Sequence, residues 1–233
     1  MRALAGTNWG QQKETLMLTF KSLIRSLITY ACPIWFPNAK PSSLNRLQTL
    51  QNAALRIATG CVKMTSIGHL HAEASVLPVT DHLSLLSSQY LARCLVPSNP
   101  SHSIVTAPSG PRSMKYTLQS RFLPTVSPYL SNGSLPHNSY KLAIQSLHTS
   151  AVSSYISSRP PNRILHQPHP PIAEEENTLP RPFRTTLAQL RSGFCPSLNS
   201  YLERVGRSPD GLCPSCRGAP HTARGICVHR ARP

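Results

Sequence analysis

Hydrophobic residues recur at helical spacing near the start of the chain. The first stripe consists of Leu16, Phe20, Leu23, Leu27 and Tyr30. Intervals of three and four residues place such positions on one face of a helix with about 3.6 residues per turn. The pattern predicts an amphipathic helix over residues 13–31, with Pro33 at or just beyond its end. We expect the whole stripe to face a hydrophobic core.

The same periodicity predicts further helices up to residue 96. One starts after Pro41 and stops at Gly60, because glycine is a natural residue for a helix C-terminus. A short helix is expected over Ile67–Ala74, and a longer one from about Asp81 to Leu95. Amphipathic helices joined by short connections form small bundles. Residues 1–96 are therefore predicted to be a helical bundle.

The helical periodicity of hydrophobic residues is largely lost between residues 97 and 180. Proline, serine, asparagine and histidine dominate there, and proline lacks a backbone donor and fixes one dihedral angle. Only Tyr140–Ile156 has helical spacing, and the acidic run Glu174–Glu176 is typical of a solvated loop. We expect a Pro/Ser-rich linker with partial order.

Order is predicted to return in residues 181–233. Thr185 or Thr186 can cap a helix that Gly193 closes, and Pro196 suits the first turn of another helix. The expected fold class is therefore mainly α, in three parts. These parts are a helical bundle (1–96), a linker (97–180) and a short basic helical module with a Cys-rich tail (181–233).

The charge balance points to a polyanionic partner. The chain has 24 Lys and Arg against 8 Asp and Glu, a net charge of +16. Basic chains bind nucleic acid by neutralising phosphates and releasing counterions. Residues 181–233 contain nine Arg, opposed only by Glu203 and Asp210. We expect weak binding of single-stranded RNA or DNA with little sequence preference.

Particular side chains are candidates for these contacts. The predicted phosphate-binding residues are Arg46, Arg56, Arg184, Arg191, Arg204 and Arg207. Phe183, Phe194 and Tyr201 are available for base stacking, although a core position is the favoured reading of Tyr201.

The tail contains a cluster of potential metal ligands. Two cysteines separated by two residues, as in Cys213-Pro-Ser-Cys216, can both bind one tetrahedral zinc ion. Further ligands could come from His221, Cys227 or His229. The set Cys213, Cys216, His221 and Cys227 is close in spacing to a zinc knuckle, which is a nucleic-acid-binding device. The alternative is a tail that binds no metal.

Other partners and compartments are less favoured. Residues 1–14 lack the apolar core of a signal peptide, and an odd number of cysteines suits a reducing compartment, either cytoplasm or nucleus. Lys21 and Arg25 break the most apolar stretch, which excludes a transmembrane helix there. No pattern predicts a small-molecule substrate.

Several motifs resemble one protein family in the same order. Residues 3–10 (ALAGTNWG) and 13–16 (KETL) resemble the start of the thumb region in reverse transcriptases of jockey-like non-LTR retrotransposons. Residues 30–35 (YACPIW) and 52–60 (NAALRIATG) resemble its next helices. The family's basic C-terminal segment is similar to residues 190–193 (LRSG), 198–202 (LNSYL) and 213–216 (CPSC).

The resemblance implies a thumb that grips primer and template, separated from its catalytic core. The family polymerises DNA on RNA with two metal ions held by palm carboxylates, including an Asp-Asp pair. This chain has only Asp81 and Asp210, so the resemblance implies a palm and fingers before Met1 and no catalytic Mg²⁺ site here. We expect no polymerase activity. Gly225 and His229 occupy positions where the family has its last His and Cys.

Two alternative functions remain. The amphipathic bundle could bind another protein, with the basic charge incidental. A hydrolase or nuclease would need a constellation such as Cys61 with His69 and His71, which is far less expected. Salt dependence separates the first two functions, because only nucleic-acid affinity should fall steeply with salt.

Overall fold

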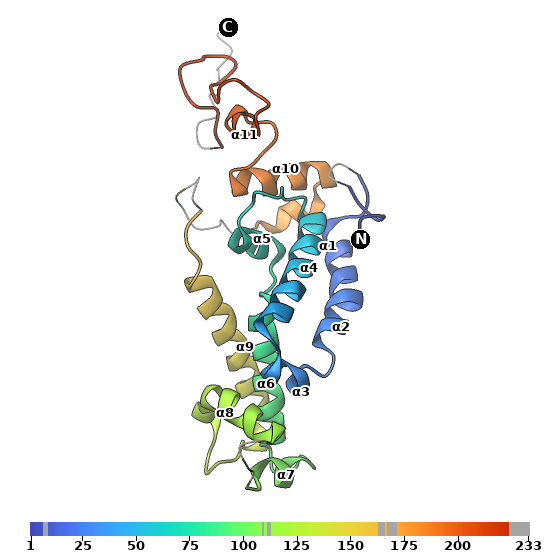
Figure 1. Ribbon diagram of the computed structural model, residues 1–233, viewed down its shortest axis with the longest axis vertical. Coiled ribbons are helices and arrows are strands. Elements are labelled where there is room, and N and C mark those ends of the chain that lie inside the picture. The colour runs from blue at the N-terminus through green and yellow to red at the C-terminus, as the bar shows by residue number, and fades with distance from the viewer. Residues whose placement is uncertain (7–8, 109, 111–112, 163–165, 167–171, 224–233) are drawn as a thin grey trace. The chain divides into compact units, whose positions relative to one another are not determined.

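The fold is mainly α, as the sequence predicts (Figure 1). The computed structural model describes residues 1–6, 9–108, 110, 113–162, 166 and 172–223. Within these residues, strand-like pairing is limited to isolated bridges. The α-helices are α1 (Lys13–Thr19), α2 (Ser26–Thr29), α3 (Cys32–Trp35), α4 (Pro41–Thr59), α5 (Ile67–Ala74), α6 (Val79–Cys94), α7 (His102–Thr106), α8 (Met114–Val126), α9 (Tyr140–Ser157), α10 (Arg181–Ser192) and α11 (Asn199–Arg204). A π-helix, η1 (Phe20–Arg25), and the 3₁₀ turns η2 (Phe36–Asn38), η3 (Ser127–Tyr129), η4 (His137–Ser139) and η5 (Glu174–Thr178) complete the set.

The chain forms two compact units, and both are assembled from separated segments. Unit 1 contains Met1–Ser22, Asn52–Val76 and Arg159–Pro233. Unit 2 contains Leu23–Gln51 and Leu77–Ser158. These boundaries differ from the expected breaks at residues 96 and 180. The boundary between Ser22 and Leu23 falls inside η1, and the boundary between Gln51 and Asn52 falls inside α4.

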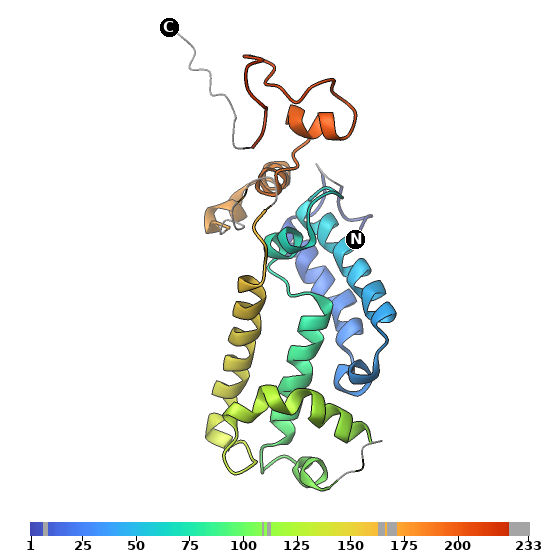
Figure 2. The ribbon, with the colours of Figure 1, turned by 60° about the vertical axis from the view of Figure 1, so that its left-hand side comes forward.

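Unit 2 is built around α6. This helix packs beside α9 and against α8 and α3 (Figure 1 and Figure 2). Phe36 of η2 and Phe122 of α8 are both buried, and their rings stack with centroids 6.1 Å apart. The core continues through Leu83 and Leu91 of α6 to Leu147 of α9.

The expected linker therefore contributes a large part of this core. Phe122 and Val126 of α8 and Leu147 of α9 are almost fully buried. Prolines in this segment mostly lie between helices: Pro136, for example, precedes η4 as its N-cap. The prolines of this segment thus lie mostly near the ends of helices. The high proline content made the segment look irregular, although the short apolar runs between the prolines form helices.

The first predicted helix is also different in structure. It divides into α1, η1 and α2, and the expected stripe is buried only at Leu16 and Phe20. Leu23, Leu27 and Tyr30 are 63%, 79% and 80% exposed. The buried or half-buried positions instead recur every four residues, at Leu16, Phe20, Ile24, Ile28 and Cys32. The wider i→i+5 winding of η1 suits an interval of four.

Unit 1 packs α10 against the end of α4. Gly60 ends α4 with a φ of +75°, as the sequence predicts, and a Cβ there would lie 2.4 Å from the Thr185 side chain. Glycine therefore allows both the left-handed turn and the close approach of α10. Gly193 closes α10 as expected, whereas the helix begins at Arg181, four residues before Thr185.

No helix in the part of the chain that the structure describes combines the length and the apolar character needed to cross a bilayer.

Candidate nucleic-acid interface

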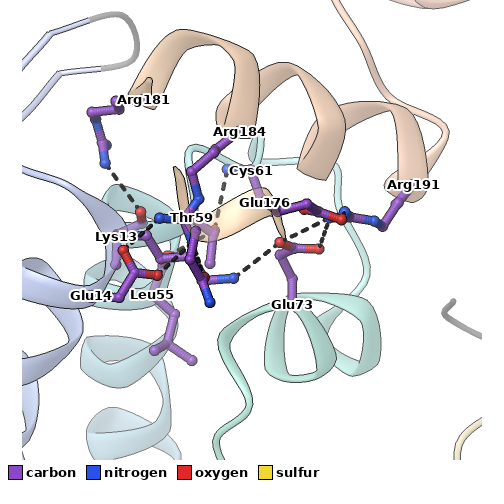
Figure 3. A network of polar contacts seen from close by, with 12 residues as sticks. Lys13, Glu14, Leu55, Thr59, Cys61, Glu73, Glu176, Arg181, Arg184 and Arg191 are labelled. Atoms are coloured by element: carbon purple, nitrogen blue, oxygen red, sulfur yellow. Dashed lines mark hydrogen bonds and ion pairs between the residues drawn. The ribbon is translucent and has the colours of Figure 1, made fainter. Parts of the chain in front are cut away.

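Three arginines project from one side of α10 (Figure 3). Arg181, Arg184 and Arg191 are spaced by three and seven residues, which places them on the same helix face. Ala188 lies on that face too and is buried. The arginines therefore point into unit 1, where they meet backbone carbonyls and carboxylates.

Arg181 satisfies the carbonyls at the end of α4. Its guanidinium donates to the carbonyl oxygens of Ile57 at 2.7 Å and Ala58 at 3.3 Å, and also to those of Gly6 and Gln11. The last carbonyls of a helix have no partner inside it, so this buried arginine acts as a cap. Burial lowers the pKa of Arg181, with a smaller effect from the positive charge nearby on Arg184. The sequence pattern did not single out Arg181.

Arg184 is bound to Glu14 of α1. Both terminal guanidinium nitrogens donate to the two carboxylate oxygens, and one also donates to Asn177 Oδ1 at 3.2 Å. This fork-to-fork geometry is the strongest form of Arg–carboxylate pairing, and it holds the pKa of the Glu14 carboxyl below its usual range. Arg184 is almost fully buried, so its predicted role as a phosphate contact is not supported.

Arg191 is held between two carboxylates. Its Nη1 donates to Glu73 Oε2 at 3.0 Å, and its Nη2 donates to Glu176. Lys13 Nζ donates to the same buried Glu73 carboxylate at 3.1 Å. Burial alone would lower the pKa of Arg191, but the two carboxylates raise it overall. Arg191 thus has an internal role in place of the predicted phosphate contact, and Glu176 is part of a packed network rather than a solvated loop.

A groove in unit 1 brings together two of the predicted nucleic-acid-binding residues, Phe194 and Arg204. Phe194, just after α10, meets the ring of Tyr201 edge-on with centroids 6.4 Å apart. The guanidinium carbon of Arg204 on α11 lies 5.8 Å from the centroid of Phe194. Both residues line a groove of about 490 Å³. The other lining residues, none of which the sequence pattern pointed to, are Met64, Ser66, Gly68, Pro160, Pro161, Asn162 and Ser192.

The remaining predicted cations are dispersed. Arg207 is exposed after α11, outside the lining of the groove. Arg56 is half-buried and donates to the Lys63 carbonyl at 3.4 Å. Arg46 is exposed on the part of α4 that belongs to unit 2. Phe183 is exposed on α10 and also lies outside the groove lining.

The cysteine turn is well defined, but its histidine is oriented unlike a ligand. Cys213 N–H donates to the Ala219 carbonyl at 2.9 Å beside an antiparallel bridge between Leu212 and Pro220. His221 Nδ1 accepts from the Asn199 N–H at 3.2 Å. A neutral imidazole that accepts a hydrogen bond at Nδ1 carries its proton on Nε2. A metal-bound histidine instead binds the metal through one nitrogen and donates a hydrogen bond through the other. In His221 the lone pair of Nδ1 faces the Asn199 N–H, so neither nitrogen is arranged to bind zinc.

The described residues therefore fit a zinc site only in part. Cys213 is buried and Cys216 is exposed, and no group of three or more potential ligands gathers within residues 1–223 as far as these are described. Cys227, the fourth predicted ligand, lies outside the described residues.

The residues of the less expected hydrolase constellation, Cys61, His69 and His71, are buried in unit 1. Burial raises the pKa of Cys61 to about 11, despite a hydrogen bond from Thr59 that lowers it, so the reactive thiolate is scarce at neutral pH. His71 is fully buried between the Val76 carbonyl at 3.0 Å and Asn52 Oδ1 at 2.9 Å. His69 is buried as well. These positions suit packing better than nucleophilic catalysis.

A scan of protein families, and searches of curated proteins and of solved structures, found no match to this chain. Its function is therefore inferred from its own residues.

Proposed function

We propose that this chain is a non-catalytic, nucleic-acid-binding remnant of a jockey-like non-LTR retrotransposon reverse transcriptase. Its partner is single-stranded RNA or DNA, bound weakly and with little sequence preference. The helical part that resembles a thumb and the basic segment after residue 180 both contribute cations to this binding.

The observation that carries the proposal is the charge left after internal pairing. Glu14, Glu73 and Glu176 are paired with Arg184, Lys13 and Arg191, so these charges cancel one for one. The net charge of +16 is therefore carried by the remaining side chains, which include the exposed Arg46, Arg204 and Arg207. A surplus of this size favours a polyanion, and phosphate contacts without base readout give low sequence preference.

The proposal excludes polymerase chemistry by this chain. Two-metal catalysis needs carboxylates that share two ions about 3.5–4 Å apart. The chain has two Asp residues, Asp81 in unit 2 and Asp210 in unit 1, and three of its Glu residues are committed to ion pairs. Primer extension on an RNA template with Mg²⁺ should therefore give only background.

Zinc binding by the tail is a second part of the proposal. Cys213 and Cys216 would supply thiolates, with Cys227 as a further ligand. A bound zinc ion would tie the tail to the cysteine turn. Metal content should fall in Cys213→Ser and Cys216→Ser, whereas His221→Ala should change it little because of the orientation of its ring. Full zinc content in both serine variants would contradict this part.

The direct test is binding of the full chain to a fluorescent single-stranded RNA at several salt concentrations. Affinity should fall steeply with salt, and Arg204→Ala with Arg207→Ala should reduce the logarithmic salt slope by about 0.7 for each phosphate that is no longer neutralised. Ser197→Ala, which changes an exposed neutral residue, is the control. Affinity that does not depend on salt would contradict the proposal.

A protein-binding role is the second candidate. It is favoured by the exposed apolar side chains of Leu23, Leu27 and Tyr30. Under this alternative, binding to a partner protein would weaken in Leu27→Ser and would depend little on salt.

A further inference from the structure

We infer that the groove lined by Phe194 and Arg204 receives an unstacked base of single-stranded nucleic acid, with a neighbouring phosphate at Arg204. This inference rests on the proposed function and specifies one contact within it. It goes beyond charge, because it assigns a site where an aromatic ring and a cation act on the same nucleotide.

The lining of the groove has the chemistry of a nucleotide site. Phe194, Met64 and the pair Pro160–Pro161 offer apolar surface to a flat ring, while the polar groups of Ser192 and Asn162 make hydrogen bonds inside unit 1. The volume of about 490 Å³ falls within the range of about 300–1,000 Å³ typical of small-molecule pockets. No acidic residue lines the groove within the described part of the chain, so a phosphate meets no repulsion there.

Phe194 is held in place by the end of α10. Its N–H donates to the Gln189 carbonyl at 3.1 Å, and the Gly193 N–H donates to that of Leu190 at 2.9 Å, which makes a Schellman-type C-terminus. The helix itself is fixed by the ion pairs of Arg184 and Arg191. A ring positioned before binding costs less ordering entropy when a base stacks on it.

Asn162 connects two of the segments that line the groove. Its side-chain Nδ2 donates to the carbonyls of Ser192 at 3.1 Å and Arg191 at 3.4 Å. These bonds connect the segment after Pro160–Pro161 to the end of α10. Two segments that line the groove are therefore held together by hydrogen bonds.

Arg204 supplies the cation. It is exposed, and its guanidinium lies near the Phe194 ring. A guanidinium can stack on a base and bind a phosphate with the same planar group, which lysine cannot do. Stacking on an aromatic ring tolerates any base, so this site is consistent with binding of low sequence preference.

The test uses the full chain and a single-stranded RNA that carries one 2-aminopurine, whose fluorescence reports base stacking. Phe194→Ala should weaken binding by about 5- to 150-fold, the range expected when one base–aromatic stack is removed. It should also abolish the fluorescence change. Tyr116→Ala, which removes an exposed aromatic side chain outside the groove, is the matched control and should bind like the parent. Phe194→Leu keeps an apolar side chain in place, and it should weaken binding to the same extent if stacking is the cause.

Two further comparisons separate base from phosphate. An RNA of the same length with an abasic site should bind the parent more weakly, and the Phe194→Ala variant no differently. Arg204→Lys should reduce affinity although the charge is kept, whereas Arg93→Lys, at an exposed position outside the groove, should not.

The outcomes are distinct. If the parent shows salt-dependent binding but the Phe194 variants behave like Tyr116→Ala, the groove is not the site, while the proposed function stands. If the parent binds no RNA at any salt concentration, both fail. If adenosine monophosphate binds in a Phe194-dependent way while RNA binding is unchanged in the variants, the ligand is a free nucleotide and the inference is overturned.

Discussion

At the scale of single residues, Glu73 connects three helices of unit 1. Its buried carboxylate accepts from Lys13 of α1 and Arg191 of α10, and both of these cations are themselves mostly buried. A buried carboxylate between two cations is favourable only while all the partners remain. Sequence alone gives no sign of this, because Glu73 is the lone acid of its short helix and both cations lie far away in sequence, 60 residues for Lys13 and 118 for Arg191.

Replacing Glu73 by Gln should therefore destabilise unit 1 strongly. The change leaves Lys13 and Arg191 without this shared negative charge, and removal of one partner of a buried pair costs about 3–5 kcal/mol. Urea unfolding should show a lower midpoint with an unchanged slope. Glu175→Gln, at an exposed position, is the control and should unfold like the parent. A Glu73→Gln midpoint equal to the parent's would show that the pairs contribute no net stability.

His82 should make unit 2 sensitive to mild acid. Burial, together with the positive charges of Arg25 and His148, lowers the pKa of His82 from 6.5 to about 4. The unfolded chain therefore takes up a proton below pH 6.5 that the folded chain does not, so stability is full above pH 6.5 and falls as the pH drops toward 4.

Between pH 7.5 and pH 5.5 this linkage should cost about 1.4 kcal/mol of unfolding free energy. Denaturant titrations at the two pH values measure it. The decrease should be smaller in His82→Gln and unchanged in Asn138→Gln, an exposed site in the same unit. An equal decrease in both variants would assign the acid sensitivity to other groups.

At the scale of elements, periodicity predicted helices better than it predicted their faces. The short helix Ile67–Ala74 and the glycine stops at Gly60 and Gly193 are confirmed. The stripe of the first helix is wrong beyond Phe20, because apolar residues come in adjacent pairs there, such as Leu27 and Ile28. Two stripes are then possible, and the local winding of the helix decides between them. The spacing of hydrophobic residues does not predict the π-helical winding of η1.

The pair Leu27 and Ile28 tests which face is buried. Ile28 packs against the core of unit 2, whereas Leu27 is exposed. Ile28→Ala should cost about 1–2 kcal/mol, below the cost at a fully buried site, and Leu27→Ala should stay within about 0.5 kcal/mol of the parent. Thermal and urea unfolding of the two variants give the comparison. The reverse order would restore the face predicted from the sequence.

In the candidate site too, the sequence predicts residue types but not contacts between residues that are distant in the chain. Phe194 and Arg204 could be selected from the sequence because they are an aromatic residue and a cation in a basic segment. Arg184 and Arg191 looked equally suitable, but their carboxylate partners lie far away in sequence: Glu14 is 170 residues from Arg184. Composition cannot distinguish a paired arginine from an exposed one when the partner is that distant.

At the scale of the whole molecule, the two units interleave along the chain, and the middle segment belongs to a core. Phe122 and Leu147 are buried in unit 2 although they lie between residues 97 and 180. Buried, helical backbone exchanges its amide hydrogens slowly because exchange needs local or global opening.

Hydrogen exchange should therefore show protection over Met114–Val126 and Tyr140–Ser157. Phe122→Ala should reduce it in both helices, since a buried Phe-to-Ala change costs about 3–5 kcal/mol. Gln145→Ala, at an exposed position of α9, should leave the protection unchanged. Fast exchange of both helices in the parent would instead support the partly ordered linker that the sequence predicts for residues 97–180.

The ion pair between Glu14 and Arg184 also has a consequence for synthesis of the chain. A ribosome adds about 5–20 residues per second, so the intervening 170 residues take roughly 10–30 s to appear. During that interval unit 2 can be completed, whereas α1 and α5 are already outside the ribosome without the helix that covers them. We therefore expect unit 1 to remain incomplete until α10 has been synthesised, with the buried faces of α1 and α5 exposed in the meantime.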